Sequence, residues 1–346
     1  MRQLFLRKLC YAVVMLALIF DGCAWKQGEA DKKTLRQSIY EMWKTKPERT
    51  TYLYFHKYAE ENKKFLDMDG FRLCYVEKGA GEAVLLLHGL FGAKDTWRAS
   101  FMPMAEHFRT VAIDYPGSGD SDNPHQSVYR YNPEHLAETT LQVMDRLDIK
   151  QAHLVGNSLG GMISLMIARD HPERIKSLVL IAPAVWDYYG KIVKAGGLAF
   201  GFGPALAAAR PTAEFGNALM DDTVYNKDVL TDADRYDAVK FLMQNGARNA
   251  LIEKSRELFN EEYLRKVSAT FTGLKTRTLI IWGEEDGVLP PLTAHRLYEQ
   301  LPNSEVLFIP FCGHHPQEEV PRIMNEELLW FLSNGKLGTR SNMRRP

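Results

Sequence analysis

The sequence has few cysteines, no excess of charge of either sign and no long apolar run. Its four cysteines include no Cys-x-x-Cys pair, so the sequence predicts neither a zinc site nor a disulfide framework. Lysine plus arginine and aspartate plus glutamate number 43 each, which gives no electrostatic reason to expect a nucleic-acid partner. With 346 residues, 45% hydrophobic, the chain is long enough for one core with an inserted subdomain. We expect no metal and no cofactor.

The N-terminus differs from the rest of the chain. Arg2, Arg7 and Lys8 precede twelve apolar residues, 9–20, which would span about 18 Å as a helix, short of the roughly 30 Å of a membrane core. This layout is typical of a signal peptide. The run ends in Phe-Asp-Gly-Cys at Cys23, which resembles a bacterial lipoprotein processing site, although the aspartate departs from it. We therefore expect an exported, membrane-associated protein, and the alternatives to lipidation are an uncleaved signal anchor and simple secretion.

Short apolar runs alternate with helical patterns through most of the remaining chain. An Asp-Gly pair ending at Gly70 separates the first two runs and is typical of a hairpin turn. The runs predicted as strands are residues 65–68, 71–76, 83–87, 111–113, 152–155, 177–181, 278–282 and 306–309. Strands alternating with helices predict an α/β fold, with a mainly parallel sheet covered by helices on both faces. Cys74 and Cys312 are expected to be buried thiols, and a disulfide between them is the alternative.

The alternation stops between residues 187 and 272, which are apolar and helix-like without a convincing strand. Such an insertion begins after the carboxyl end of one strand and ends before the next strand. It therefore lies over the carboxyl edge of the sheet, where binding sites form, and we interpret it as a helical cap. Residues 24–60 contain both lysines and aromatic residues, and we interpret them as a tether. This tether is expected to be solvated, packed on the domain or located near lipid headgroups. The predicted parts are 1–23 signal or anchor, 24–60 tether, 61–186 and 273–334 core, 187–272 cap, and 335–346 tail.

Ser158 lies in the pattern Gly-x-Ser-x-Gly, between a predicted strand and the apolar helical stretch 162–168. A strand that turns directly into a helix brings backbone close to backbone, and a β-carbon on either flanking residue would crowd the turn. The pattern therefore predicts a nucleophile elbow. An activated serine needs a base, and the base needs an orienting acid. Asp286 follows the second-last predicted strand and His314 follows the last one, which is the serine–acid–histidine order of α/β hydrolases.

Five sequence motifs, found in a fixed order within residues 65–334, together resemble those of one protein superfamily. They are His88-Gly89, residues 114–121 (Asp-Tyr-Pro-Gly-Ser-Gly-Asp-Ser), residues 156–161 (Gly-Asn-Ser-Leu-Gly-Gly), residues 282–286 (Trp-Gly-Glu-Glu-Asp), and residues 313–316 (Gly-His-His-Pro) followed by Glu319-Val320-Pro321. The sequence resembles the α/β-hydrolase superfamily in its capped serine esterase and lipase branch, similar to bacterial lipases and monoacylglycerol-lipase-like hydrolases. The resemblance implies an α/β-hydrolase fold with an inserted helical cap.

The positions of the motifs assign a role to each site residue. Ser158 is the predicted nucleophile, His314 the base and Asp286 the acid that orients it. The backbone N–H groups of Leu90 and Leu159 are the predicted oxyanion hole.

Several alternatives remain open at this level. His315 is an alternative base and Asp187 an alternative acid. Asp114 and Asp120 are interpreted as structural anchors of their loop, and His88 as a residue that orients the oxyanion loop without transferring a proton.

The presence of serine at position 158 limits which reactions the protein can be expected to catalyse. Relatives that act as dehalogenases or epoxide hydrolases place aspartate at the position of Ser158, so both readings are excluded. Two reactions remain: hydrolysis of a small-molecule acyl ester through an acyl-enzyme, which we favour, and C–C hydrolysis of meta-cleavage products. Enzymes of the second kind share Gly-Asn-Ser-x-Gly-Gly but usually place arginine where this chain has Gly287. A non-catalytic binding protein on the same scaffold is disfavoured because the triad is intact, and the oligomeric state is not predicted.

Replacing Cys23 by serine tests the N-terminal interpretation. A lipidated protein begins at Cys23 and carries acyl chains, each buried CH₂ adding about 0.8 kcal/mol to membrane binding. Cys23→Ser is then expected to block processing and leave a heavier, full-length precursor, measured by intact mass spectrometry of detergent-extracted protein. A full-length, unlipidated mass in the parent protein would instead indicate a signal anchor.

Overall fold

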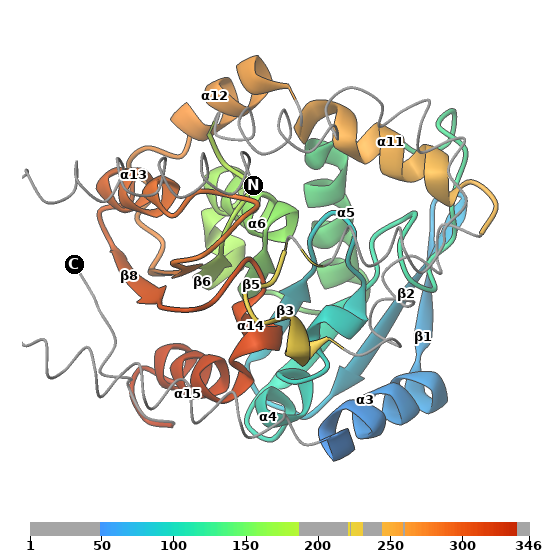
Figure 1. The fold of residues 1–346 in the computed structure, drawn as a ribbon. Helices are drawn as coiled ribbons and strands as arrows, with labels where there is room; N and C mark the ends of the chain where they lie inside the picture. Colours follow the sequence, from blue (N-terminus) through green and yellow to red (C-terminus); the bar gives the residue numbers. More distant parts are fainter. Residues whose placement is uncertain (1–48, 187–220, 222, 231–243, 259, 338–346) are drawn as a thin grey trace, which may run out of the picture. The chain divides into compact units, whose positions relative to one another are not determined.

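The computed structural model describes residues 49–186, 221, 223–230, 244–258 and 260–337 (Figure 1). Contacts divide the chain into residues 1–41 and 42–346, and every described residue belongs to the second part. The predicted signal or anchor, most of the tether and cap, and most of the tail lie outside the described residues. No helix within the described ranges is both long and apolar enough to cross a membrane.

An eight-stranded sheet organises the described residues, in the order β1-β2-β4-β3-β5-β6-β7-β8. β1 pairs antiparallel with β2, and β2 with β4, whereas all the other pairs are parallel. The strands are β1 (Lys64–Met68), β2 (Phe71–Lys78), β3 (Ala83–Leu87), β4 (Arg109–Ile113), β5 (Ala152–Asn157), β6 (Ile175–Ile181), β7 (Thr278–Gly283) and β8 (Ser304–Ile309). The predicted α/β fold, its eight strands and the first hairpin are confirmed. Gly70 has φ +94° in that hairpin, a conformation that favours glycine.

Helices cover both faces of the sheet. α5 (Pro133–Arg146), α6 (Leu159–Asp170) and α13 (Leu292–Gln300) lie on one side, and α3 (Arg49–Asn62), α4 (Phe101–Ala105) and α15 (Pro321–Leu332) on the other (Figure 1). The remaining helices are α11 (Ala247–Leu258), α12 (Glu261–Ala269), α14 (Pro316–Glu319) and the 3₁₀ turns η1 (Lys94–Trp97), η2 (Pro172–Arg174) and η3 (Lys227–Val229). α11 and α12 are the described helices of the predicted cap.

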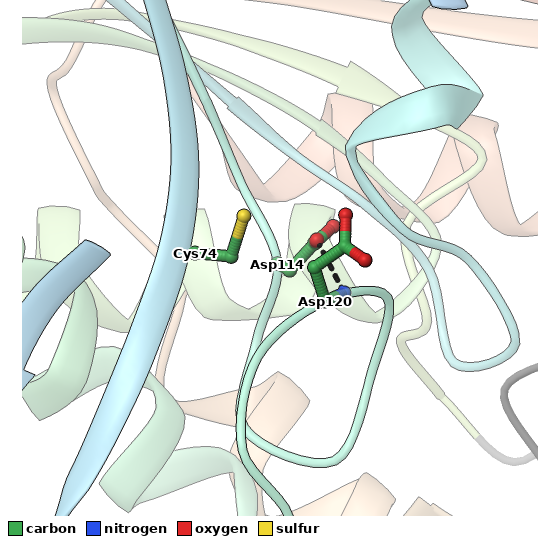
Figure 2. Close-up of side chains that lie close together, drawn as sticks. All are labelled: Cys74, Asp114 and Asp120. Carbon is green, nitrogen blue, oxygen red and sulfur yellow. Dashed lines mark hydrogen bonds between the residues drawn. The ribbon is translucent and has the colours of Figure 1, made fainter. Parts of the chain in front are cut away.

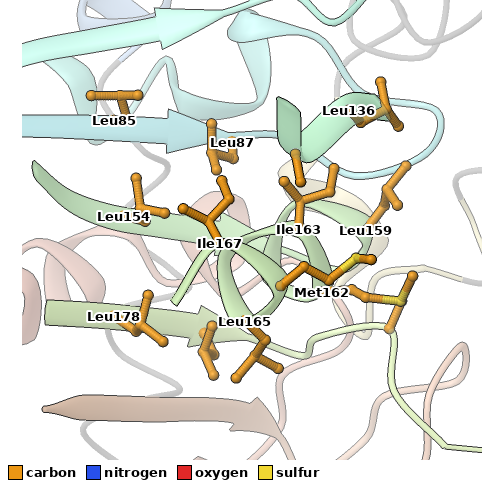
Figure 3. Packing of buried hydrophobic residues seen from close by; sticks show 14 of the residues in the cluster. Leu85, Leu87, Leu136, Leu154, Leu159, Met162, Ile163, Leu165, Ile167 and Leu178 are labelled. Atoms are coloured by element: carbon orange, nitrogen blue, oxygen red, sulfur yellow. The ribbon is translucent and has the colours of Figure 1, made fainter. Parts of the chain in front are cut away.

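α6 is the central helix of the core. Every residue from 159 to 168 is buried, because the sheet covers one side of α6 and α5 packs against another. Figure 3 shows Ile163 and Ile167 of α6 close to Leu87 and Leu154 of the two central strands. A helix that is apolar on all sides has no solvent-facing stripe and needs such an enclosed position. The same packing fixes the start of α6, where Ser158 lies.

The strand order reverses direction between β3 and β5. From β3 the chain proceeds to β4 on one side, then returns to place β5 on the other side of β3. In open parallel sheets the carboxyl ends of the strands at such a switch point form the binding crevice. The loop that begins at His88 follows β3, and Ser158 follows β5, so the fold brings two of the predicted motifs to this point.

α3 packs on the domain, although it belongs largely to the predicted tether. Phe55 is fully buried, and its ring lies 5.3 Å from that of Phe101 in an edge-to-face arrangement. The hydroxyl of Tyr58 donates to the carbonyl of Glu77 in β2 at 2.8 Å. Residues 54–62 therefore pack on the α/β domain, which is one of the alternatives predicted for the tether.

Replacing Phe55 by alanine tests this packing. Removal of a buried aromatic side chain costs about 3–5 kcal/mol when the cavity stays open. We expect Phe55→Ala to lower the free energy of unfolding by about that amount in urea denaturation. Tyr54→Ala is the control, because Tyr54 is 57% exposed and its loss should change stability by less than about 0.5 kcal/mol. Equal effects of the two variants would contradict a packed α3.

Candidate active site

Ser158 alone joins β5 to α6. Its backbone has φ +54° and ψ −116°, an unfavourable conformation for a residue with a β-carbon. Three contacts hold it there: its N–H donates to the carbonyl of Ile181 at 2.9 Å, and its own carbonyl accepts from Ala184 at 2.9 Å and Gly161 at 3.0 Å. The surrounding structure therefore fixes the strained turn that the sequence pattern predicts.

The glycines around Ser158 are required by close backbone contacts. A β-carbon on Gly156 would lie 2.3 Å from the carbonyl oxygen of Gly160, and one on Gly160 would lie 2.1 Å from that of Leu87. Both distances are far inside van der Waals contact, and backbone atoms have little freedom to move aside. α6 can therefore start next to the end of β3 only if these two positions are glycine.

The loop after β3 runs beside Ser158. A β-carbon on Gly89 would lie 3.2 Å from the β-carbon of Ser158, which places the segment leading to Leu90 next to the predicted nucleophile. Leu159, the other predicted oxyanion donor, is the first residue of α6, and N–H groups in a first helical turn lack acceptors within the helix. The two predicted donors thus belong to segments that meet at Ser158.

His88 holds this loop in place. Its Nε2 accepts from the N–H of Tyr115 at 3.1 Å, so its Nδ1 carries the proton and donates to the carbonyl of Gly89 at 2.7 Å. Burial lowers the pKa of His88 to about 3, so the ring is neutral at physiological pH. These contacts suit the orienting role predicted for His88.

His314 and Asp286 are hydrogen-bonded to each other. Nδ1 of His314 lies 2.8 Å from Oδ2 of Asp286, and both side chains are buried. Oδ1 of Asp286 accepts from the N–H groups of Val288 and Leu289, each at 2.8 Å. Because the carboxylate acts as an acceptor, Nδ1 of His314 is the protonated nitrogen and Nε2 keeps its lone pair. The structure thus brings together two residues that are 28 positions apart in the sequence.

Asn157 connects the nucleophile turn to the histidine loop, a contact that the sequence did not indicate. Its side-chain amide donates to the carbonyl oxygens of Ile181 and His314, each at 3.2 Å. Asn157 immediately precedes Ser158, so the backbone at His314 is tied to the turn that carries the serine. Ser158, His314 and Asp286 therefore belong to one connected set of segments.

The structure describes the alternative base, His315, but not the alternative acid, Asp187. Burial, followed by the nearby His314 and Arg98, lowers the pKa of His315 well below its usual value. Nδ1 of His315 lies 3.2 Å from the amide of Gln317 and 3.7 Å from Glu318, so its neighbours differ from those of His314. Asp187, the alternative acid, lies outside the described residues.

Cys74, Asp114 and Asp120 are the described residues whose donor atoms could hold a metal ion (Figure 2). Lys94 already forms ion pairs with both carboxylates, with Nζ 3.0 Å from Asp114 and 2.7 Å from Asp120. Burial raises the pKa of the Cys74 thiol, so the sulfur keeps its proton and is a poor metal ligand. The carboxylates instead anchor the loop after β4, because Asp114 also accepts from the N–H groups of Lys94 and Asp120.

A second serine–histidine–carboxylate arrangement lies at the other end of the strands. His153 Nδ1 is 2.7 Å from the hydroxyl of Ser177, and its Nε2 is 3.3 Å from Glu82. Ser177 lies near the start of β6, is 1% exposed, and is not at the carboxyl edge where sites form in parallel sheets. We treat it as a structural hydrogen-bond network, and it supplies a matched control for Ser158.

Lys254 joins α11 to the loop after β4. Its side chain is 2% exposed, and Nζ donates to the hydroxyl of Ser118 at 2.7 Å. Burial lowers the pKa of Lys254 to about 7. The contact is close, because a β-carbon on Gly117 would lie 2.3 Å from that of Ala250. Nothing in the sequence around Lys254 singled it out.

A cavity of about 420 Å³ lies between residues 125–132 and α11. Polar side chains line it, among them Glu253 and Arg256 of α11. The predicted catalytic residues are not among its lining residues, so we do not assign it to the substrate.

The similarity of this chain to known proteins agrees with the fold and the arrangement of residues described above. Residues 82–321 match the family model of the alpha/beta hydrolase fold. The chain belongs to the α/β-hydrolase family. The match begins just before β3 and ends at the start of α15, so it includes the turn at Ser158, the inserted region and the loop of His314.

Relatives of this α/β hydrolase differ in what they are named for. It is 31% identical over 255 residues to a dihydrolipoyllysine-residue acetyltransferase component of an acetoin cleaving system from Pseudomonas putida, covering 73% of this chain but only 64% of that relative. The chain thus spans less than two thirds of that protein's length. It is 28% identical to a 2-hydroxymuconate semialdehyde hydrolase of Pseudomonas sp. strain CF600, covering 72% of this chain and 86% of the relative. A crystal structure of a meta-cleavage product hydrolase variant has a TM-score of 0.69 at 26% identity, covering 80% and 99% of the two chains.

Replacing Lys254 by methionine tests the cost of its burial as a function of pH. Below about pH 7 lysine is protonated in both states, and the folded state bears the full penalty of a buried ammonium. Between about 7 and 10.5 the folded state releases the proton while the unfolded chain keeps it, so wild-type stability rises with pH. We therefore expect Lys254→Met to be more stable than wild type by the largest margin at pH 7 and below. That margin should shrink by up to about 1.4 kcal/mol per pH unit above 7.

Urea denaturation at several pH values measures this margin. Lys150→Met, a change at an exposed lysine, is the control and should show a pH-independent difference. A constant margin for Lys254→Met would show that Lys254 ionises as it does in the unfolded chain.

Proposed function

We propose that this α/β hydrolase cleaves carboxylic esters of small acyl substrates through an acyl-enzyme formed on Ser158. The observation that carries the proposal is the 2.8 Å hydrogen bond between His314 Nδ1 and Asp286. It fixes the tautomer in which Nε2 of His314 accepts a proton, and the buried carboxylate stabilises the imidazolium that results.

The chemistry follows from these positions. Oγ of Ser158 attacks the ester carbonyl as His314 takes its proton, and the N–H groups of Leu90 and Leu159 stabilise the oxyanion, each by about 3 kcal/mol. Collapse of the tetrahedral intermediate breaks the bond to the alcohol, which leaves with the proton from His314. Water then attacks the acyl-enzyme, again losing a proton to His314, and the carboxylic acid is released. No step requires a cofactor.

C–C hydrolysis of meta-cleavage products is the second candidate, supported by the similarity to 2-hydroxymuconate semialdehyde hydrolase. Against it stands Gly287, directly after the predicted acid, where enzymes of that class usually carry arginine. Without that guanidinium, a charged dienoate lacks one expected counter-charge. An acyl ester needs none, so we favour the ester.

We further propose that the protein is exported and held at a membrane by its N-terminal segment, either through a lipidated Cys23 or through an uncleaved signal anchor. The basic residues before the apolar run and Cys23 at its end support this location. A membrane-associated hydrolase would meet acyl esters where they are concentrated, which agrees with the proposed substrate class.

Labelling with a fluorophosphonate tests the nucleophile. We expect covalent labelling of wild type and of Ser177→Ala, and none of Ser158→Ala, because the reagent reacts only with an activated serine. Ser158→Ala should also lower turnover by about 10⁴–10⁶-fold while leaving the fold intact. Labelling that persists in Ser158→Ala would refute the assignment.

A substrate comparison separates the two candidate reactions. p-Nitrophenyl esters of graded chain length and 2-hydroxymuconate semialdehyde should be compared by kcat/KM on the same preparation. The proposal requires the better value for an ester. A higher value for the semialdehyde would establish the C–C hydrolase and leave the role of Ser158 unchanged.

A further inference from the structure

Glu319 is a buried carboxylate whose contacts are with backbone N–H groups. It is 3% exposed and lies at the end of α14, five residues after His314. Oε1 accepts from the N–H of Gly313 at 2.8 Å. Oε2 accepts from the N–H groups of Tyr225 at 2.8 Å and Asn226 at 3.3 Å. One side chain thus bonds to two segments that are almost ninety residues apart in sequence.

The two segments also contact each other directly. The N–H of His314 donates to the carbonyl of Thr223 at 2.7 Å. A β-carbon on Gly313 would lie 2.7 Å from that same carbonyl oxygen and 2.8 Å from the nitrogen of Tyr225, so glycine is needed for this approach. His314 therefore has its own backbone bonded to residue 223, and the residue before it bonded to Glu319.

We propose that Glu319 is a positioning residue, which holds His314 in place by joining its loop to residues 223–226. This inference rests on the proposed role of His314 as the base. Residues 223–226 follow the first part of the predicted cap in the sequence, so a displacement of that segment would be passed to the histidine through Glu319 and Thr223. His314 would then be an effective base only when residues 223–226 are in the observed position.

The electrostatics of Glu319 explain why it serves this purpose. A carboxylate has acceptor sites on both oxygens and no proton in the way, so it can bond to N–H groups on both sides at once. Burial raises the pKa of Glu319 to about 7, and the backbone hydrogen bonds oppose that rise. The thiol of Cys312 lies beside Glu319, and the neighbouring Glu318 is ion-paired with Arg98 and lies 3.7 Å from His315.

Glu319→Gln and Glu319→Ala test the inference, with Glu327→Gln as the control at another fully buried glutamate. Glutamine keeps one acceptor but presents an amide donor to the N–H groups on the other side. We expect Glu319→Gln to slow fluorophosphonate labelling of Ser158 by about 10–100-fold, since small misplacements of a catalytic group have effects of this size. Glu319→Ala should be slower still, Glu327→Gln should match wild type within twofold, and kcat should fall while KM changes little. Unchanged labelling in a folded Glu319→Gln would overturn the proposal.

Hydrogen–deuterium exchange supplies a readout of the connection itself. In Glu319→Gln, exchange should rise together in peptides covering residues 223–230 and 311–319. A rise in only one of them would overturn the coupling. If neither variant folds, the same exchange measurement on the wild-type protein tests the inference. The N–H groups of Gly313 and Tyr225 should then exchange through one common opening rate, and independent rates would refute the inference. The exchange experiment does not depend on labelling of Ser158. Failure of the wild-type protein to label at Ser158 would therefore count against the proposed function and not against the connection through Glu319.

Discussion

The close approach of α6 to the end of β3 is the constraint on which the site depends. With a single residue between β5 and α6, the first turn of the helix lies against the carbonyl of Leu87, a contact that Gly160 alone permits. The helix can occupy this position because its surface is apolar all round and is covered by the sheet and α5. The strain at Ser158 is held by the packing of α6 and by hydrogen bonds to the strand ends. The hydroxyl is therefore presented by a rigid element.

The buried charges around this turn are stabilised in different ways. Asp286 and Glu319 receive hydrogen bonds from backbone N–H groups, which fixes the loops that donate them. Asp114 is paired with the ammonium of Lys94, which links the loop after β4 to the segment after the oxyanion loop. Lys254 has a hydroxyl as its partner, and burial lowers its pKa although the charge of Asp114 opposes that shift. Loops that carry few apolar residues are thus held by polar contacts made in a dry environment, where such contacts are strong.

The sequence predicts those features that depend on local patterns. Apolar runs predicted every strand that the structure describes, and the central strands β3, β5 and β7 are apolar along most of their length because both of their faces are covered. The order of Ser158, Asp286 and His314 predicted which residues would meet, and the contact between Asp286 and His314 was found. The amide of Asn157 and the carboxylate of Glu319 were not predicted as connectors, because their partners are backbone groups that leave no trace in residue identity. The packing of α3 was left open for a related reason: Phe55 is one of several aromatic residues in a polar stretch, and only the partner ring of Phe101 distinguishes it.

The long connection between β6 and β7 has an evolutionary consequence. These two strands are parallel neighbours, with Leu178 opposite Thr278, so the chain leaves the sheet at the carboxyl end of β6 and crosses over to enter at the amino end of β7. Their pairing requires a crossover of about a dozen residues and sets no upper limit on the length of the connection. Apart from residues 223–226, which contact the loop of His314, the connection can therefore gain, lose or replace residues over generations while the strands that precede Ser158, Asp286 and His314 stay in place. Such an arrangement lets the inserted region diverge quickly under selection while the predicted site residues keep their positions, which suits a family whose members carry such different names.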